Sequence, residues 1–187
     1  MGALSYRKTV SALARRALPL LMVLGAVGAR ADDYADVGRL IGARQFPQAL
    51  AKAEQYLSSK PRDPQMRFLK GVIQNETGKA ADAVEIFTKI TEDYPELAEP
   101  YNNLAALYAG QNQFDKARVA LEMAIRINPD YAIAHENLGD VYARLASQSY
   151  GKAIGLNAGN AALLGKLALT KQLLAPVATS AGLAKPP

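Results

Sequence analysis

The residue types that support enzymatic chemistry are sparse in this 187-residue chain. It contains no Cys and a single His, His135, so neither a thiolate nucleophile nor a disulfide framework nor a His-based metal cluster can form. We expect His135 to pack against its neighbours rather than to act in catalysis. No glycine-rich phosphate loop, nucleophile elbow or catalytic pair of carboxylates is found. The sequence therefore predicts a protein that is not an enzyme and that uses no cofactor or metal.

One acidic cluster has the chemistry of a cation site. Glu92, Asp93, Glu96 and Glu99 surround a predicted loop. A calcium loop places its oxygen ligands at fixed intervals, and these four residues do not follow that spacing. We interpret the cluster as a solvated acidic turn.

Two asparagines offer binding chemistry instead. Asn103 and Asn137 are 34 residues apart (137 − 103). An amide side chain has both a donor and an acceptor, so it can pair with a peptide unit whatever side chain that unit carries. The alternative is that each amide bonds to a neighbouring helix. The elements that position the two residues decide between these interpretations.

Two short helices, each with one apolar face, are predicted in the stretch from 98 to 130. The face of the first helix is formed at i, i+3, i+4 and i+7 by Tyr101, Leu104, Ala105 and Tyr108. Asn112 lies in the break that follows, and Asn tolerates a left-handed helix end. The face of the second helix is formed by Ala117, Leu121 and Ala124. Neither helix can bury its face alone, so copies of the pair are expected.

The copies are marked by prolines at a fixed interval. Pro61, Pro95 and Pro129 are spaced 34 residues apart (95 − 61 and 129 − 95). At this period Ala49 and Ala83 align with Ala117. This arrangement resembles the pattern of the tetratricopeptide repeat family. In that pattern a large residue is followed by Leu, by Gly or Ala and by Tyr, and then by alanines and a closing Pro. The resemblance implies an all-α, right-handed solenoid of antiparallel helix pairs with about three and a half repeats, and a protein that binds protein partners.

The N-terminal segment, residues 1–31, has the features of a secretory signal peptide. Its start is basic, residues 17–29 are uncharged and apolar, and Ala29-Arg30-Ala31 fits a small-x-small cleavage site. We predict cleavage after Ala31, a periplasmic location and membership of the exported bacterial type of the family. The alternative, a membrane anchor, needs roughly 20 apolar residues. No integral membrane span is expected after cleavage.

The mature chain divides into three parts. Residues 32–157 are predicted to form the repeat domain, residues 158–175 a C-terminal capping helix and residues 176–187 a disordered tail. The fourth repeat lacks a turn signal between Val141 and Gln148. We expect either one long helix from about Ala132 to Gly155 or a tightened turn, of which the long helix is favoured. The capping helix should be amphipathic, with Leu163, Leu167 and Leu174 on one face.

The formal net charge of +5 of the whole chain comes from its N-terminal segment. The first 31 residues hold five bases and no acid, which leaves 17 basic and 17 acidic residues in the remainder. The segment from Glu76 to Asp140 contains 12 acids and five bases, which favours a neutral or basic partner and disfavours nucleic acid. Residues 141–187 contain five bases and no acid, which also fits a membrane surface.

The family resemblance implies that the first helices of successive repeats line a concave groove. The predicted groove residues are Phe68, Val72, Asn75, Asn102, Asn103, Ala106, Asn137, Asp140 and Arg144. In some members, Asn at the position of Asn103 and Asn137 forms a ladder that grips the backbone of an extended peptide. A clamp on a terminal carboxylate needs convergent bases, and only Arg144 is placed for that role, because Lys70 should point into its helix pair.

Together these features predict a non-catalytic adaptor of the bacterial cell envelope that binds a peptide segment or partner protein in the groove. Two alternatives stay open. One is a membrane-surface structural element that acts through the basic C-terminal helix, and the other is an accessory subunit that positions an envelope enzyme. The partner, the envelope process and the oligomeric state are left undetermined by the sequence.

Overall fold

A computed structural model describes residues 30–157 and 159–175, and all regular structure in these ranges is helical. The predicted signal peptide falls almost wholly on residues 1–29, and the predicted tail on 176–187, so both lie outside the described residues. The chain forms two compact units that divide after Leu138, within a helix.

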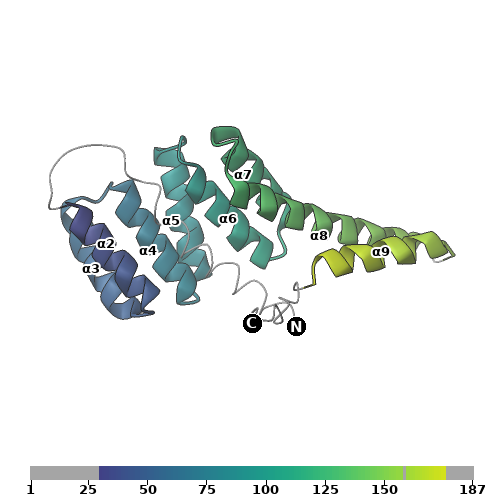
Figure 1. Cartoon of the computed structure of the whole chain (residues 1–187), viewed down its shortest axis with the longest axis horizontal. Helices are drawn as coiled ribbons and strands as arrows, with labels where there is room; N and C mark the ends of the chain where they lie inside the picture. Colours follow the sequence, from purple (N-terminus) through teal and green to yellow (C-terminus); the bar gives the residue numbers. More distant parts are fainter. Residues whose placement is uncertain (1–29, 158, 176–187) are drawn as a thin grey trace, which may run out of the picture. The chain divides into compact units, whose positions relative to one another are not determined.

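The first unit consists of helix pairs (Figure 1). The pairs are α2 (Arg30–Gly42) with α3 (Phe46–Ser59), α4 (Pro64–Glu76) with α5 (Ala80–Asp93), and α6 (Ala98–Gly110) with α7 (Phe114–Ile127). The two helices of each pair contact each other, and α3 contacts α4 as α5 contacts α6. The first helices α2 and α4 also touch. The predicted all-α solenoid of antiparallel helix pairs is confirmed.

The same turn joins the helices of all three pairs. Arg44, Gly78 and Asn112, spaced by the 34-residue period, have φ angles of 58°, 82° and 59°. The next residue in each case donates its N–H over 2.9 Å to the carbonyl of Leu40, Gln74 or Tyr108. These bonds satisfy carbonyls that a helix end leaves without partners. The predicted left-handed end at Asn112 is confirmed.

The prolines also occupy equivalent points, each in the connection to the next pair. Pro61, Pro95 and Pro129 lie in turns closed by equivalent backbone bonds: Asp63 to Lys60 (3.2 Å), Leu97 to Tyr94 (3.2 Å) and Tyr131 to Asn128 (3.1 Å). The periodicity of the sequence is therefore a periodicity of the backbone.

Small residues bring the paired helices together. Ala49, Ala83 and Ala117, which occupy equivalent positions in the second helices of the three pairs, are fully buried. In the middle pair, Gly71 of α4 faces the ring of Phe87 of α5 so closely that an added Cβ would lie 2.8 Å from Cζ. Phe87 is fully buried, and burial of such a side chain contributes about 1.5–3 kcal/mol.

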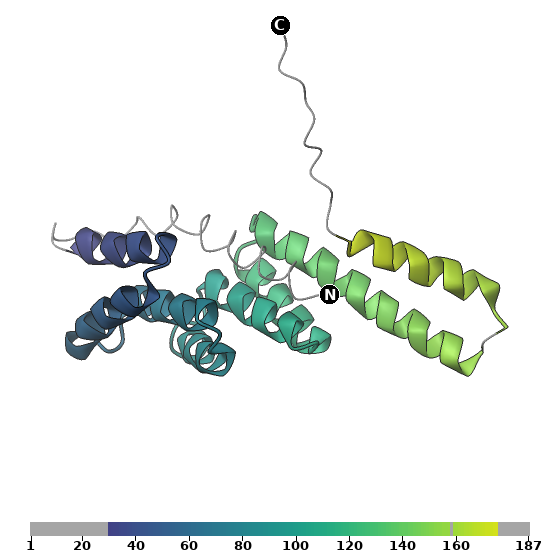
Figure 2. The same ribbon diagram turned by 90° about the horizontal axis from the view of Figure 1, so that it is seen from below.

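The second unit starts at Gly139 and contains most of α8 (Ala132–Leu156) and all of α9 (Ala161–Leu173). The favoured prediction, one long helix in place of a fourth hairpin, is confirmed by the 25 residues of α8. Figure 2 shows α9 beside the second half of α8. The three leucines predicted to share one face, Leu163, Leu167 and Leu174, are all half-buried. No described helix combines the length and apolar character that a membrane span requires.

Candidate partner-binding site

The first helix of the second repeat, α4, is positioned by a hydrogen-bonded network at its start. Asp63 caps the helix by accepting the Met66 N–H at 2.8 Å. The Tyr34 hydroxyl of α2 donates to Asp63 Oδ2 at 2.6 Å and lies 2.8 Å from the hydroxyl of Tyr56 in α3. Burial, followed by the bond to Asp63, raises the pKa of Tyr34 well above its usual range. Three helices therefore meet at one capping carboxylate.

An amide bridge joins α6 to the start of α8. The Nδ2 of Asn137 donates to the Oδ1 of Asn102 at 2.9 Å. Asn102 is fully buried, so the prediction that its side chain lines an open groove is wrong. Its amide finds a partner on the adjacent repeat and is enclosed there. Asn102 Nδ2 has no hydrogen-bond partner among the described residues.

The two predicted ladder asparagines make different bonds. Asn103 is half-buried and donates from Nδ2 to the backbone oxygen of Glu99, one turn earlier in α6, at 2.9 Å. Asn137 is also half-buried but bonds across to α6. The alternative interpretation, an amide bonded to a neighbouring helix, therefore describes Asn137 but not Asn103.

The apolar candidates are shared between the surface and the core. Phe68 is half-buried, and its ring meets the ring of Phe87 edge-on at 5.4 Å between centroids. Val72, one turn later on α4, packs against the core cluster formed by α2, α3 and α4. Asn75 on α4 and Ala106 on α6 are half-buried. Each of these residues keeps part of its side chain accessible.

The remaining groove candidates, Asp140 and Arg144, lie on α8. Asp140 is exposed and Arg144 half-buried, and both lie on the part of α8 that belongs to the second unit. Lys70 forms an ion pair with Glu54 of α3, in the preceding pair, at 2.9 Å between Nζ and Oε1. The expectation that Lys70 points into its own helix pair is therefore wrong.

His135 differs from the prediction. Its side chain is exposed, and Nε2 lies 2.8 Å from the carbonyl oxygen of Pro129. The expected packing role is therefore wrong. The imidazole finds a polar partner in the preceding turn, which an aromatic ring at this repeat position could not use.

The acidic turn is partly neutralised by ion pairs. Nη1 of Arg67 on α4 lies 2.6 Å from Oδ2 of Asp93, and Nζ of Lys89 lies 3.5 Å from Oε2 of Glu92. The hydrogen bond from Arg67 lowers the pKa of Asp93 below its usual range. In the ranges 30–157 and 159–175, no group of three or more acidic or His side chains could hold a metal ion.

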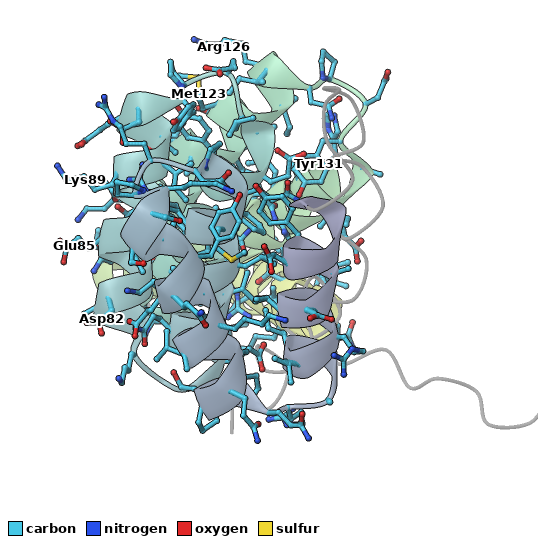
Figure 3. The ribbon with its side chains drawn as sticks, turned by 90° about the vertical axis from the view of Figure 1, so that its left-hand side faces the viewer. Asp82, Glu85, Lys89, Met123, Arg126 and Tyr131 are labelled. Atoms are coloured by element: carbon cyan, nitrogen blue, oxygen red, sulfur yellow. The ribbon has the colours of Figure 1, made fainter. Side chains whose placement is uncertain are left out.

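Sequence reasoning missed Tyr131, which lies next to Glu99. The side chain is half-buried, and burial, with a smaller contribution from Glu99, raises its pKa to about 12. Figure 3 shows Tyr131 on the side where α2 lies, and Asp82, Glu85 and Lys89 of α5 on the other side. Tyr131 lies in the turn that contains Pro129, between one helix pair and the next. This position in the sequence could have indicated a residue at the junction of two pairs.

Three hairpins with one turn geometry, one proline position and shared small-residue contacts define a helical repeat protein, in which first helices of successive repeats form a common face. Two family models identify the repeat. A tetratricopeptide repeat model matches residues 39–98, and a TPR repeat model matches residues 108–145. The chain belongs to the tetratricopeptide repeat family.

Two relatives match part of the chain. A chloroplast tetratricopeptide repeat domain-containing protein from Arabidopsis thaliana, PYG7, is 38% identical over 52 residues, which cover 28% of this chain and 17% of that protein. The probable biofilm formation methyltransferase WspC from Pseudomonas putida is 32% identical over 92 residues, or 49% of this chain and 22% of that protein. The chain thus spans about a fifth of the length of these relatives.

The fold is also that of solved repeat structures. TTC0263, a thermophilic TPR protein of Thermus thermophilus, superimposes with a TM-score of 0.58 at 23% identity, and the match covers 78% of this chain and 83% of that one. At this identity the likeness concerns the fold alone. Tetratricopeptide repeat proteins are typically non-catalytic scaffolds for protein–protein interaction.

Proposed function

We propose that this protein is a non-catalytic adaptor of the bacterial cell envelope that binds a peptide segment or a partner protein. The binding face is formed by the first helices of its repeats, α4, α6 and the start of α8. The bridge between Asn102 and Asn137 supports this proposal best. It joins α6 to the start of α8, so that the first helices of two successive repeats are held next to each other, as one continuous binding face needs.

The accessible groups around the bridge match an extended peptide. Asn103 and Asn137 each keep an amide oxygen that can accept a peptide N–H, since each amide donates through Nδ2. Phe68 and Ala106 add half-buried apolar surface for the side chains of the peptide. Amide groups would thus hold the backbone, and the apolar residues would select among sequences.

The charge of this region and the N-terminal segment restrict the partner. Twelve acids and five bases lie between Glu76 and Asp140, so a neutral or basic segment is favoured over nucleic acid. The signal-like residues 1–31 support a periplasmic location, where the partner would also be found.

Photo-crosslinking from two matched positions tests the proposal. A photoreactive residue at Ala106, on the proposed face, should capture a defined partner in cells. The same residue at Val119, a 56% exposed position on α7, should not. With the captured partner purified, Ala106→Arg should weaken binding by about tenfold or more, because it removes one well-packed contact and adds a charge, whereas Val119→Arg should leave binding unchanged.

Capture from Val119 alone, or equal loss of binding in both arginine variants, would contradict the proposed face. The accessory-subunit alternative makes a different prediction. Asn103→Ala combined with Asn137→Ala would then leave the complex with the enzyme intact. A thermal unfolding curve of that double variant must accompany the test, because Asn137→Ala removes the hydrogen bond to buried Asn102.

A further inference from the structure

The first helices α4 and α6 and the start of α8 carry one carboxylate each: Glu76, Glu99 and Glu136. Among the residues that the structure describes, none of these three acids forms an ion pair. The acids elsewhere in the first unit differ, since Asp36 and Asp93 are both paired with bases. The carboxylates of the proposed binding face therefore lack a counter-charge within the described chain.

The bases of the same helices are held by second helices. Helix α6 and residues 132–138 contain no Lys or Arg, and α4 contains two bases, Arg67 and Lys70. Arg67 is paired with Asp93 of α5, and Lys70 is paired with Glu54 of α3. A face that has carboxylates and no available base has a negative potential, which attracts a cationic group.

Glu99 has the best-defined surroundings of the three carboxylates. Glu99, Asn103 and Ala106 follow one side of α6 at i, i+4 and i+7, and all three are half-buried. The Nδ2 of Asn103 donates to the backbone oxygen of Glu99 at 2.9 Å. The Oδ1 of Asn103 is therefore an acceptor within one helical turn of Glu99.

Tyr131 adds a hydroxyl next to Glu99. It follows the turn after α7 and lies on the side where α2 lies, whereas Asp82 and Lys89 of α5 lie on the other side (Figure 3). Because its pKa is raised to about 12 by burial and, to a smaller degree, by Glu99, the hydroxyl is neutral at physiological pH. A neutral hydroxyl can accept a hydrogen bond as well as donate one.

We propose that Glu99, Asn103 and Tyr131 form a subsite for a Lys or Arg side chain, so that the partner is a basic segment. This inference rests on the proposed function, because the subsite lies on the proposed binding face. Ammonium and guanidinium groups have donors and no acceptor, so they match a carboxylate beside an amide oxygen and a hydroxyl. A neutral segment would instead cover Glu99 and leave its charge without a partner, which costs affinity.

Selection from a phage-displayed library of short random peptides, with the purified protein as the target, tests the subsite. We expect Lys or Arg to dominate one position of the selected peptides. The variant Glu99→Lys should change the preference at that position to Asp or Glu, because the charge of the subsite is reversed.

Isothermal titration calorimetry with the strongest selected peptide measures the contact itself. Glu99→Gln keeps the shape of the side chain and should raise the dissociation constant by about tenfold, the usual effect of losing a hydrogen bond between charged groups. Glu96→Gln is the matched control, because Glu96 is exposed in the turn before α6. This control removes the same charge and should leave the dissociation constant unchanged.

A change in the peptide tests the same contact in the unchanged protein. Replacing the basic residue of the peptide by norleucine, for lysine, or by citrulline, for arginine, should also raise the dissociation constant by about tenfold. With Glu99→Gln the same replacement should have an effect of less than about twofold, because the carboxylate that pairs with the base is already gone.

The outcomes separate this inference from the proposed function. Selected peptides that show no basic preference, but that lose binding in Ala106→Arg, would overturn the subsite and leave the proposed function standing. Equal effects of Glu99→Gln and Glu96→Gln would also overturn the subsite, since the overall charge would then attract the peptides. Failure to select any peptide would contradict the subsite and peptide binding together.

Discussion

At the scale of single residues, the polar groups on the first-helix side serve two purposes at once. Asn102 is fully buried, Asp63 and Tyr34 are half-buried, and their hydrogen bonds join one repeat to the next. A buried polar group without a partner costs about 1–3 kcal/mol, so such bonds specify how repeats are stacked. The groups that stay accessible, such as Asn103 and Asn137, are held in place by the same kind of bond.

The raised pKa of Tyr131 makes stability depend on alkaline pH. In the unfolded chain a tyrosine titrates near pH 10, and in the folded protein Tyr131 titrates at about 12. The folded state therefore holds this proton more tightly. The resulting stability is fully present below about pH 10 and is lost as the pH rises toward 12.

We predict that Tyr131→Phe removes this dependence. The free energy of unfolding of the unchanged protein, relative to Tyr131→Phe, should be constant below about pH 10 and should fall between about pH 10 and 12. Chemical denaturation at a series of pH values measures the difference. A difference that stays flat across this window would show that the hydroxyl titrates alike in both states.

At the scale of elements, the closeness of α4 and α5 depends on the absence of a side chain at Gly71. An added Cβ would lie 2.8 Å from Phe87 Cζ, and the buried ring also holds Phe68 by an edge-on contact. The ring has no room to move away without separating the two helices.

We predict that Gly71→Ala destabilises the protein by about 1–3 kcal/mol, the usual effect of overpacking a core. It should do so although alanine is the better helix former by about 1 kcal/mol. Gly139→Ala is the control, since a Cβ there meets no atom within 4 Å, and it should be neutral or stabilising. Denaturant unfolding measures both. In Gly71→Ala combined with Phe87→Leu, much of the loss should be recovered, and equal effects of the two single alanine variants would refute the packing account.

At the scale of the whole molecule, location decides which partners the adaptor can reach. The proposed envelope function requires export to the periplasm, for which the N-terminal segment has the expected features.

We predict that a Gram-negative bacterium expressing the chain removes residues 1–31. The periplasmic protein should then have a mass that corresponds to a chain starting at Asp32. Ala31→Leu should leave the precursor uncleaved, because the cleavage site requires a small residue, whereas Ala35→Leu should be processed normally. A full-length chain in the cytoplasm would remove the basis for a periplasmic partner.

The sequence by itself determined the repeat architecture, because its evidence is local and periodic. A 34-residue spacing of Pro61, Pro95 and Pro129 implies a 34-residue spacing of turns, and Asn112 indicated where a helix must end. The long helix α8 followed from the missing turn signal. These features depend on backbone preferences that each segment expresses on its own.

Only the tertiary structure decided which polar groups are enclosed and which face outward. Asn102 and Asn103 are adjacent in sequence, yet one bonds to the next repeat and the other to its own helix. His135 stands at a position that predicted packing and is exposed. A side chain's surroundings depend on which helices approach it, and that approach involves residues far away in the chain.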